Sequence, residues 1–156
     1  MTTKSRKTNT DHGDDSDGTL SADERAALKD RTRELRRRKG KSAASPADDA
    51  QATLDAIAGL GGADRAVAER IHALITDAAP ELAPKTWYGM PAYARDGKVV
   101  VFFQPASKFK SRYATLGFND SAKLDGGAVW PVAYAVTTLS EADEAAITEL
   151  VKRAVS

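Results

Sequence analysis

The sequence predicts an α+β fold, in which two N-terminal helices and one C-terminal helix pack on a mostly antiparallel sheet of four to five strands. Two segments before residue 80 carry apolar residues at the 3.6-residue spacing of helices. The middle of the chain holds short apolar or alternating segments separated by glycine and proline turns. One more helical segment closes the chain. The strands therefore come in a run rather than alternating with helices, which favours α+β over a doubly wound sheet.

The composition excludes several classes of protein and of functional site. A chain of 156 residues is expected to form one domain, and the absence of Cys excludes disulfides, thiolate zinc sites and cysteine nucleophiles. His12 and His72 are the only histidines that could act as metal ligands or bases. His72 lies at the edge of an apolar helix stripe, so we interpret it as a packing residue or a residue at the margin of the core. No apolar run approaches the roughly 18 residues that span a bilayer, so we expect a cytoplasmic protein without a membrane partner.

Residues 1–44 read as a tail before a folded unit at residues 45–156. Residues 1–19 are polar and have no large apolar side chain after Met1, so we expect them to be disordered. Residues 25–41 hold nine Lys or Arg against two acids. Such a segment is either a solvated tail or an arm that weakly binds nucleic acid or an acidic partner. The cations proposed for nucleic acid are Arg36, Arg37, Arg38, Lys39 and Lys41.

A helix is expected within this tail. Ser21 and Glu24 have capping-box spacing, and the large apolar residues that follow are only Leu28 and Leu35. The sequence therefore predicts that removing residues 1–44 leaves the thermal midpoint nearly unchanged.

The folded unit begins with two helices. Ser45 and Pro46 suit the start of the first helix, and Gly59 ends it. Its predicted apolar stripe consists of Ala50, Leu54, Ile57 and Ala58. The second helix runs from about residue 64 to 79, before Pro80, with a stripe of Val67, Ile71, Leu74, Ile75 and Ala78.

The strands follow in order. Asp96-Gly97 predicts a two-residue hairpin between residues 92–95 and 98–101. Residues 99–103 are apolar without alternation, which is typical of a central strand buried on both faces. Another strand is expected at 112–118. Pro131 indicates that 132–136 is either an edge strand or a strand that starts after the proline. Ser140 then caps the final helix.

The aromatic segment between Trp87 and Tyr93, with Gly89 and Pro91 inside it, is the most distinctive feature. Together with Pro80-Glu81, the 96–98 turn, the apolar strand and the capped final helix, it resembles the YdhG-like proteins, domain-of-unknown-function family 1801, over about residues 47–156. The resemblance implies a frataxin-like α/β sandwich and, for some members, an iron-chaperone role. Many members carry a His-Ile-Gly element where this chain has residues 110–113.

The residues themselves favour ligand binding over an iron-chaperone role or catalysis. The acids are scattered among cations, so we expect no tight iron site, no metal ligands and no cofactor. No nucleophile with a base partner is recognisable, so we expect a binding protein rather than an enzyme, with no catalytic residues. Residues 108–113, if extended, would place cations on one face and rings on the other. The sequence does not define an oligomeric state.

We therefore predict an aromatic and basic cleft for a small anionic or planar ligand or an acidic partner. Gly89 and Pro91 fix a bend that should expose Trp87 or Tyr93 beside a cation. In the alternative interpretation these rings are core residues. The candidate ligand-binding residues are Lys85, Trp87, Tyr88, Met90, Tyr93, Lys108, Lys110, Arg112 and Tyr113.

Overall fold

The computed structural model describes residues 21–39 and 44–156, except for the side chains of residues 37–39. The predicted disorder of residues 1–19 lies outside these ranges. So do Lys41 and the side chains of Arg37, Arg38 and Lys39, which were proposed for nucleic acid.

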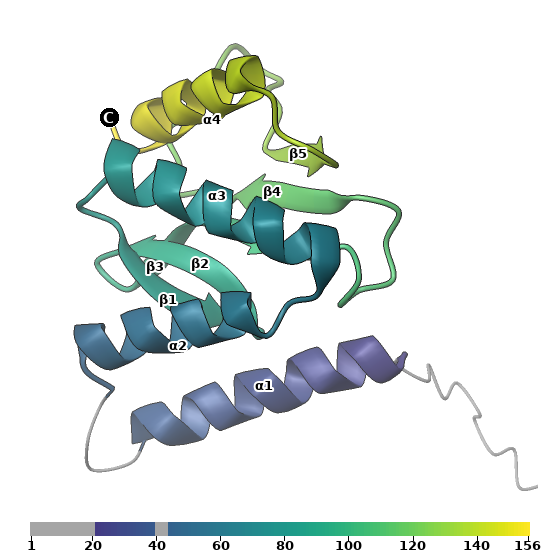
Figure 1. Ribbon diagram of the computed structural model, residues 1–156. Helices are drawn as coiled ribbons and strands as arrows, with labels where there is room; N and C mark the ends of the chain where they lie inside the picture. The colour runs from purple at the N-terminus through teal and green to yellow at the C-terminus, as the bar shows by residue number, and fades with distance from the viewer. Residues whose placement is uncertain (1–20, 40–43) are drawn as a thin grey trace, which may run out of the picture.

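The described residues form four helices and one antiparallel five-stranded sheet, which confirms the α+β prediction (Figure 1). Each strand pairs with its neighbour in sequence, so the order is β1-β2-β3-β4-β5 with β3 in the centre. The elements are α1 (Ala22–Lys39), α2 (Pro46–Ala58), α3 (Gly62–Ala78), β1 (Ala83–Trp87), β2 (Met90–Arg95), β3 (Lys98–Gln104), β4 (Ala114–Phe118), β5 (Ala133–Val136) and α4 (Glu141–Ala154).

Two tight turns build the first three strands. Asp96 and Gly97 have φ of 52° and 79°, as the type I′ turn requires, and they join β2 to β3 as predicted. Tyr88 and Gly89 have φ of 52° and 74° and join β1 to β2 in the same way. The bend expected between Trp87 and Tyr93 is therefore a hairpin turn, and Pro91 lies within β2.

The helix ends follow their capping residues. Ser45 and Ser140 each form a capping box at the start of α2 and α4. The buried stripe of α2 differs from the prediction, because Leu54 is 45% exposed whereas Thr53 is fully buried beside Ile57. The Thr53 hydroxyl donates to the Asp49 carbonyl, so its burial leaves no hydroxyl donor unused.

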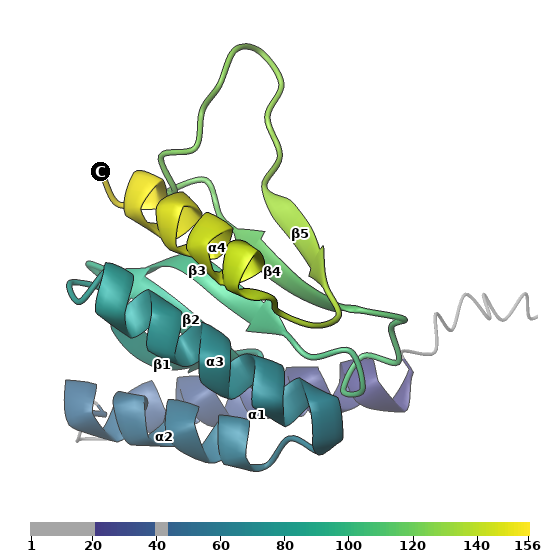
Figure 2. The same ribbon diagram turned by 45° about the horizontal axis from the view of Figure 1, so that its top comes forward.

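One side of the sheet carries the apolar core. Ile71 and Ile75 of α3 and Val151 of α4 are fully buried, together with Phe103 and Leu116 of the sheet. Arg70 of α3 and Glu144 of α4 form a two-bonded ion pair at 2.6 and 2.7 Å that ties the two helices together. Helices α3 and α4 cover this side of the sheet in both views (Figures 1 and 2).

Helix α1 lies on the other side of the sheet from α3 and α4 (Figure 2). It contacts β1. Its two leucines remain largely at the surface, because Leu28 and Leu35 are 46% and 43% exposed. Among the α1 residues whose side chains are described, Ala27 and Glu34 are buried.

Candidate functional site

A small surface hollow, which we call the Trp87 pocket, lies where α1, β1 and the start of β3 meet. Its volume is about 270 Å³. The side chains that define its chemistry are Arg31, Lys85, Trp87, Lys98 and Asp120. Three of them are cationic and one is a carboxylate, so the pocket has an excess of positive charge.

The alternation of β1 brings two predicted residues into this pocket. Lys85 and Trp87 are two positions apart, so they lie on one face of the strand, opposite Ala92 and Met90 of β2. Trp87 is half-buried, and its ring centroid lies 5.0 Å from that of Tyr88 and 5.2 Å from that of Phe102. The indole is therefore held at a fixed angle while part of it stays open.

Phe102 reaches its position because of a glycine on the next strand. Gly117 of β4 pairs with Phe102 of β3, and a Cβ at Gly117 would collide with the Phe102 ring. The ring can therefore lie across β4 and support Trp87 from the side.

Arg31 comes from α1. Its guanidinium carbon lies 5.2 Å from the centroid of the Tyr88 ring, a cation–π distance. Arg31 Nη1 is 3.6 Å from Glu34 Oε2, which is an ion pair but too long for a hydrogen bond. Thus Tyr88 orients a cation of the pocket.

Polar contacts hold α1 in place. The Gly89 amide donates to Glu34 Oε1 at 3.3 Å, and Glu34 is 7% exposed. Lys108 Nζ donates to Asp30 Oδ2 at 3.0 Å and to the Gly89 carbonyl at 3.1 Å. Lys110 Nζ lies 3.5 Å from Asp23 Oδ2. The turn after β1 and the loop after β3 therefore both hold the acids of α1.

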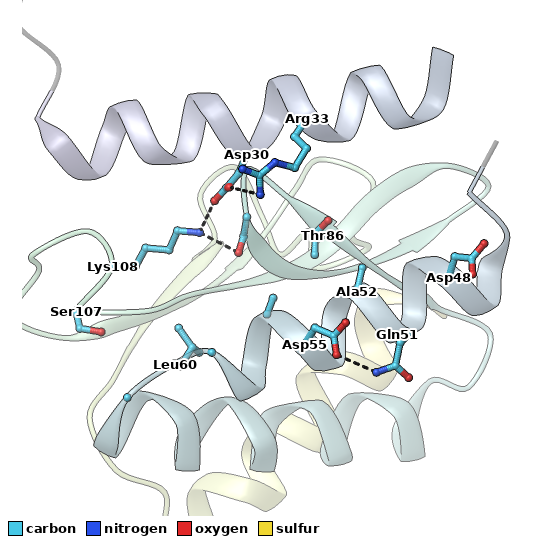
Figure 3. A pocket seen from close by; sticks show the side chains of 14 residues that line it. Asp30, Arg33, Asp48, Gln51, Ala52, Asp55, Leu60, Thr86, Ser107 and Lys108 are labelled. Carbon is cyan, nitrogen blue, oxygen red and sulfur yellow. Dashed lines mark hydrogen bonds and ion pairs between the residues drawn. The ribbon is translucent and has the colours of Figure 1, made fainter. Parts of the chain in front are cut away.

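A second and larger hollow, which we call the interhelix groove, lies between α1 and α2 and has a volume of about 790 Å³ (Figure 3). Its acids already have partners. Asp30 accepts from Lys108, Asp55 accepts from Gln51 at 2.9 Å, and Asp48 belongs to the cap of α2. Lys108 is the candidate ligand residue in this groove, and its ammonium group is used to hold α1.

Two other candidates, Tyr93 and Met90, are buried. Tyr93 is 1% exposed and faces α3, where its hydroxyl lies 2.9 Å from His72 Nδ1. Burial raises the pKa of Tyr93 and lowers the pKa of half-buried His72. Met90 is 6% exposed and pairs with Trp87 in the β1–β2 register. Tyr93 belongs to the core, which agrees with the alternative interpretation of that ring.

The remaining candidates, Lys110, Arg112 and Tyr113, lie on the loop between β3 and β4. The expectation of an extended backbone at 108–113 is wrong, because turns occupy residues 106–110 and strand β4 begins only at Ala114. Asp64 accepts bonds from the Ala106 and Ser107 amides and so fixes the start of this loop. Lys110 and Arg112 are exposed, and Arg112 lies over the neighbouring Tyr113 ring.

Arg31, Lys98 and Asp120 are the charged pocket residues that sequence reasoning missed. A pattern in α1 could have indicated that the helix docks. Asp23, Asp30 and Glu34 recur with Ala27 at spacings of three, four and seven, which places them on one face of an otherwise basic helix. An acidic stripe on a basic helix indicates that the helix could dock against cations elsewhere in the fold. A search for apolar spacing does not detect such a stripe.

Residues 21–39 and 44–156 contain no group of three or more His, Asp or Glu side chains placed to hold a metal ion. Within the same ranges, no helix has the length and apolar character that crossing a bilayer requires.

No family model, curated protein or solved structure matches this chain. The resemblance to YdhG-like proteins therefore stays a prediction that depends on the aromatic segment and the motifs around it.

Proposed function

We propose that this protein is a binding domain and that the Trp87 pocket holds a small anionic ligand with a planar part. The observation that carries the proposal is the excess of cations beside a half-open indole. Arg31 and Lys98 supply donors for a carboxylate or phosphate group, and the indole offers a flat apolar surface. The pocket volume of about 270 Å³ fits a ligand smaller than most drug-sized molecules.

The pocket is assembled from four separate parts of the chain, one of which is the loop after β4 that carries Asp120. Arg31 comes from α1, Trp87 from β1 and Lys98 from the start of β3. Arg31 is kept in place by Tyr88 and Glu34, so its charge is oriented before a ligand arrives. Preorganised charges bind an anion better than mobile ones because less side-chain entropy is lost.

Fluorescence of Trp87 can test this proposal. The chain has two Trp residues, so Trp130→Phe leaves Trp87 as the single reporter. We expect benzoate and adenosine monophosphate to change its emission saturably, and the neutral analogue benzamide to bind more weakly. The affinity for the anions should fall as ionic strength rises.

Substitutions separate the pocket from general surface charge. Lys98→Gln, in the same Trp130→Phe background, removes an exposed cation that does not hold α1, and we expect it to weaken benzoate binding about fivefold. Arg31→Gln should also weaken binding, and its thermal midpoint will report any loss of α1 docking. Arg112→Gln is the matched control outside the pocket. Absence of saturable binding up to about 10 mM, or equal affinity in Lys98→Gln and Arg112→Gln, would sink the proposal.

A further inference from the structure

The sheet has two edge strands that differ in how they are covered. Strand β1 packs against α2 and contains Pro84 and the buried Lys85. Strand β5 ends the sheet on the other side. Figure 2 shows β5 at the margin of the fold, with no described helix or strand drawn along its outer side.

The register of β5 shows which backbone groups face outward. The Phe118 amide donates to the Val132 carbonyl at 2.8 Å. In an antiparallel ladder, hydrogen-bonded pairs alternate with non-bonded pairs, so Tyr134 and Val136 also direct their backbone groups toward β4. The N–H and C=O groups of Ala133 and Ala135 consequently point away from the sheet.

The outer edge lacks the charged side chains that commonly protect an edge strand against pairing. Edge strands commonly carry charged side chains that prevent association. Residues 126–140 contain no Lys, Arg, Asp or Glu, although these types make up 29% of the chain. Val132 is 46% exposed, and Ala133 and Ala135 are exposed and small. Another strand could therefore approach without burying a charge.

We propose that two copies of this chain pair through β5, antiparallel and about a two-fold axis at Tyr134. The residues from Val132 to Val136 read Val-Ala-Tyr-Ala-Val, which is the same in both directions. In this register every cross-strand pair joins two residues of the same type, and Ala133 lies opposite Ala135 of the second copy. The outward N–H and C=O groups of both alanines are then bonded.

The same register accounts for the side chains at the edge. Tyr134 would lie opposite itself in a non-hydrogen-bonded pair, where side chains are closest. Val132 would lie opposite Val136 of the second copy, which would cover its exposed surface. Pro131 would lie opposite Thr137, so the missing proline N–H limits pairing at the ends of the palindrome. The palindrome favours a second copy over an unrelated strand.

Single cysteines can test the register, because the chain has no Cys of its own. Tyr134→Cys would place two thiols opposite each other, with Cα atoms about 4.5 Å apart, within reach of a disulfide. Ala135→Cys would leave its two thiols on diagonal positions at about 7–8 Å, beyond that reach. We expect mild oxidation to cross-link Tyr134→Cys at least tenfold faster than Ala135→Cys. Equal rates, or faster cross-linking of Ala135→Cys, would overturn the register.

Sedimentation of the full chain over a range of concentrations tests the association without cysteines. Ala135→Pro removes an outward N–H and leaves the bonds to β4 in place, so it should weaken dimerisation at least tenfold. Pro131→Ala adds an outward N–H opposite Thr137 and should tighten it by about threefold or more. Thermal midpoints at low concentration will show whether each variant is folded. A wild-type chain that stays monomeric to about 0.5 mM, or a folded Ala135→Pro variant that dimerises equally well, would refute the proposal.

Discussion

The two sides of the sheet are covered by different physical means. On the side of α3 and α4, fully buried apolar residues such as Ile75, Phe103 and Leu116 interlock. On the side of α1, Ala27 is the one buried apolar residue among the described side chains of the helix, and Glu34 and Asp30 bond to Gly89 and Lys108. Helices α3 and α4 are held by the removal of apolar surface from water, whereas α1 is held mainly by geometry-dependent polar contacts.

This difference explains how each side contributes to the molecule. Apolar burial is strong and tolerant of small changes in position, whereas a polar contact is lost when its partner moves. The apolar side is therefore suited to stability. The α1 side provides less stability but places Arg31 at the Trp87 pocket.

Two neighbouring phenylalanines in β3 allow the sharpest comparison, because they point to opposite sides. Phe103 is fully buried under the helices, and we expect Phe103→Ala to lower the free energy of unfolding by about 3–5 kcal/mol. Phe102 is half-buried on the other side, so Phe102→Ala should cost clearly less. Chemical denaturation of both variants measures the difference. Equal losses would show that the two sides contribute alike.

Deletion of residues 1–44 tests the contribution of α1. The sequence alone predicts almost no change in the thermal midpoint. The contacts of Asp30, Glu34 and Ala27 instead lead us to expect a fall of more than about 5 °C, which corresponds to roughly 1 kcal/mol in a domain of this size. The truncated chain also lacks Arg31, so benzoate binding at the Trp87 pocket should weaken. A truncated chain with both properties unchanged would show that α1 does not dock in solution.

Alanine substitutions at two glycines can measure the contact between α1 and the β1–β2 turn, because only one of the two glycines lies beside α1. Gly89 and Gly97 both occupy the second position of a type I′ turn, with φ of 74° and 79°. Alanine at either site bears a similar cost, about 1 kcal/mol, for positive φ. At Gly97 an added Cβ meets open space, whereas at Gly89 it would collide with Lys108 Nζ and Asp30 Oδ2. We expect Gly89→Ala to be the more destabilising by several tenths of a kcal/mol.

The truncated chain provides the control for this pair. Without residues 1–44, Asp30 is absent and Lys108 is free to move from Gly89. The difference between Gly89→Ala and Gly97→Ala should then shrink. A difference that persists at full size in the truncated chain would mean that it arises within the sheet.

The smallest expected effect is the pH dependence of stability that His72 causes on the apolar side of the sheet. Burial lowers the pKa of His72 below its ordinary 6.5, so the folded state disfavours the protonated ring. The unfolded chain binds a proton more readily, and stability is therefore full above about pH 6.5 and falls as the pH drops below it. His72→Gln should reduce this dependence between pH 7.5 and 5.5. Denaturation curves with the same pH dependence in both proteins would contradict the assignment.

The features that sequence predicted well have local causes. The capping boxes at Ser45 and Ser140 and the Asp96-Gly97 turn are set by residues within a few positions of one another. The apolar run from Val99 to Phe103 indicated the central strand for a similar reason, because burial on both faces removes the alternation.

The features that sequence did not predict depend on residues far apart in the chain. Tyr88 occupies the first position of a type I′ turn, where Asn, Asp or Gly is usual, so composition gave little indication of that hairpin. Lys108 turns toward Asp30, 78 positions away, instead of extending along a strand. Arg31 joins the Trp87 pocket only because α1 docks, and polar docking leaves no apolar periodicity to detect.

The order of the strands has a consequence for how the chain folds. Because every strand pairs with its sequence neighbour, every ladder closes a local loop. The loop has two residues before β2 and before β3, nine before β4 (105–113) and fourteen before β5 (119–132). Short closures cost little chain entropy and favour rapid folding. We therefore expect the hairpins of β1, β2 and β3 to form early and β5 to join last among the strands. The exposed edge would then be the final part of the sheet to appear.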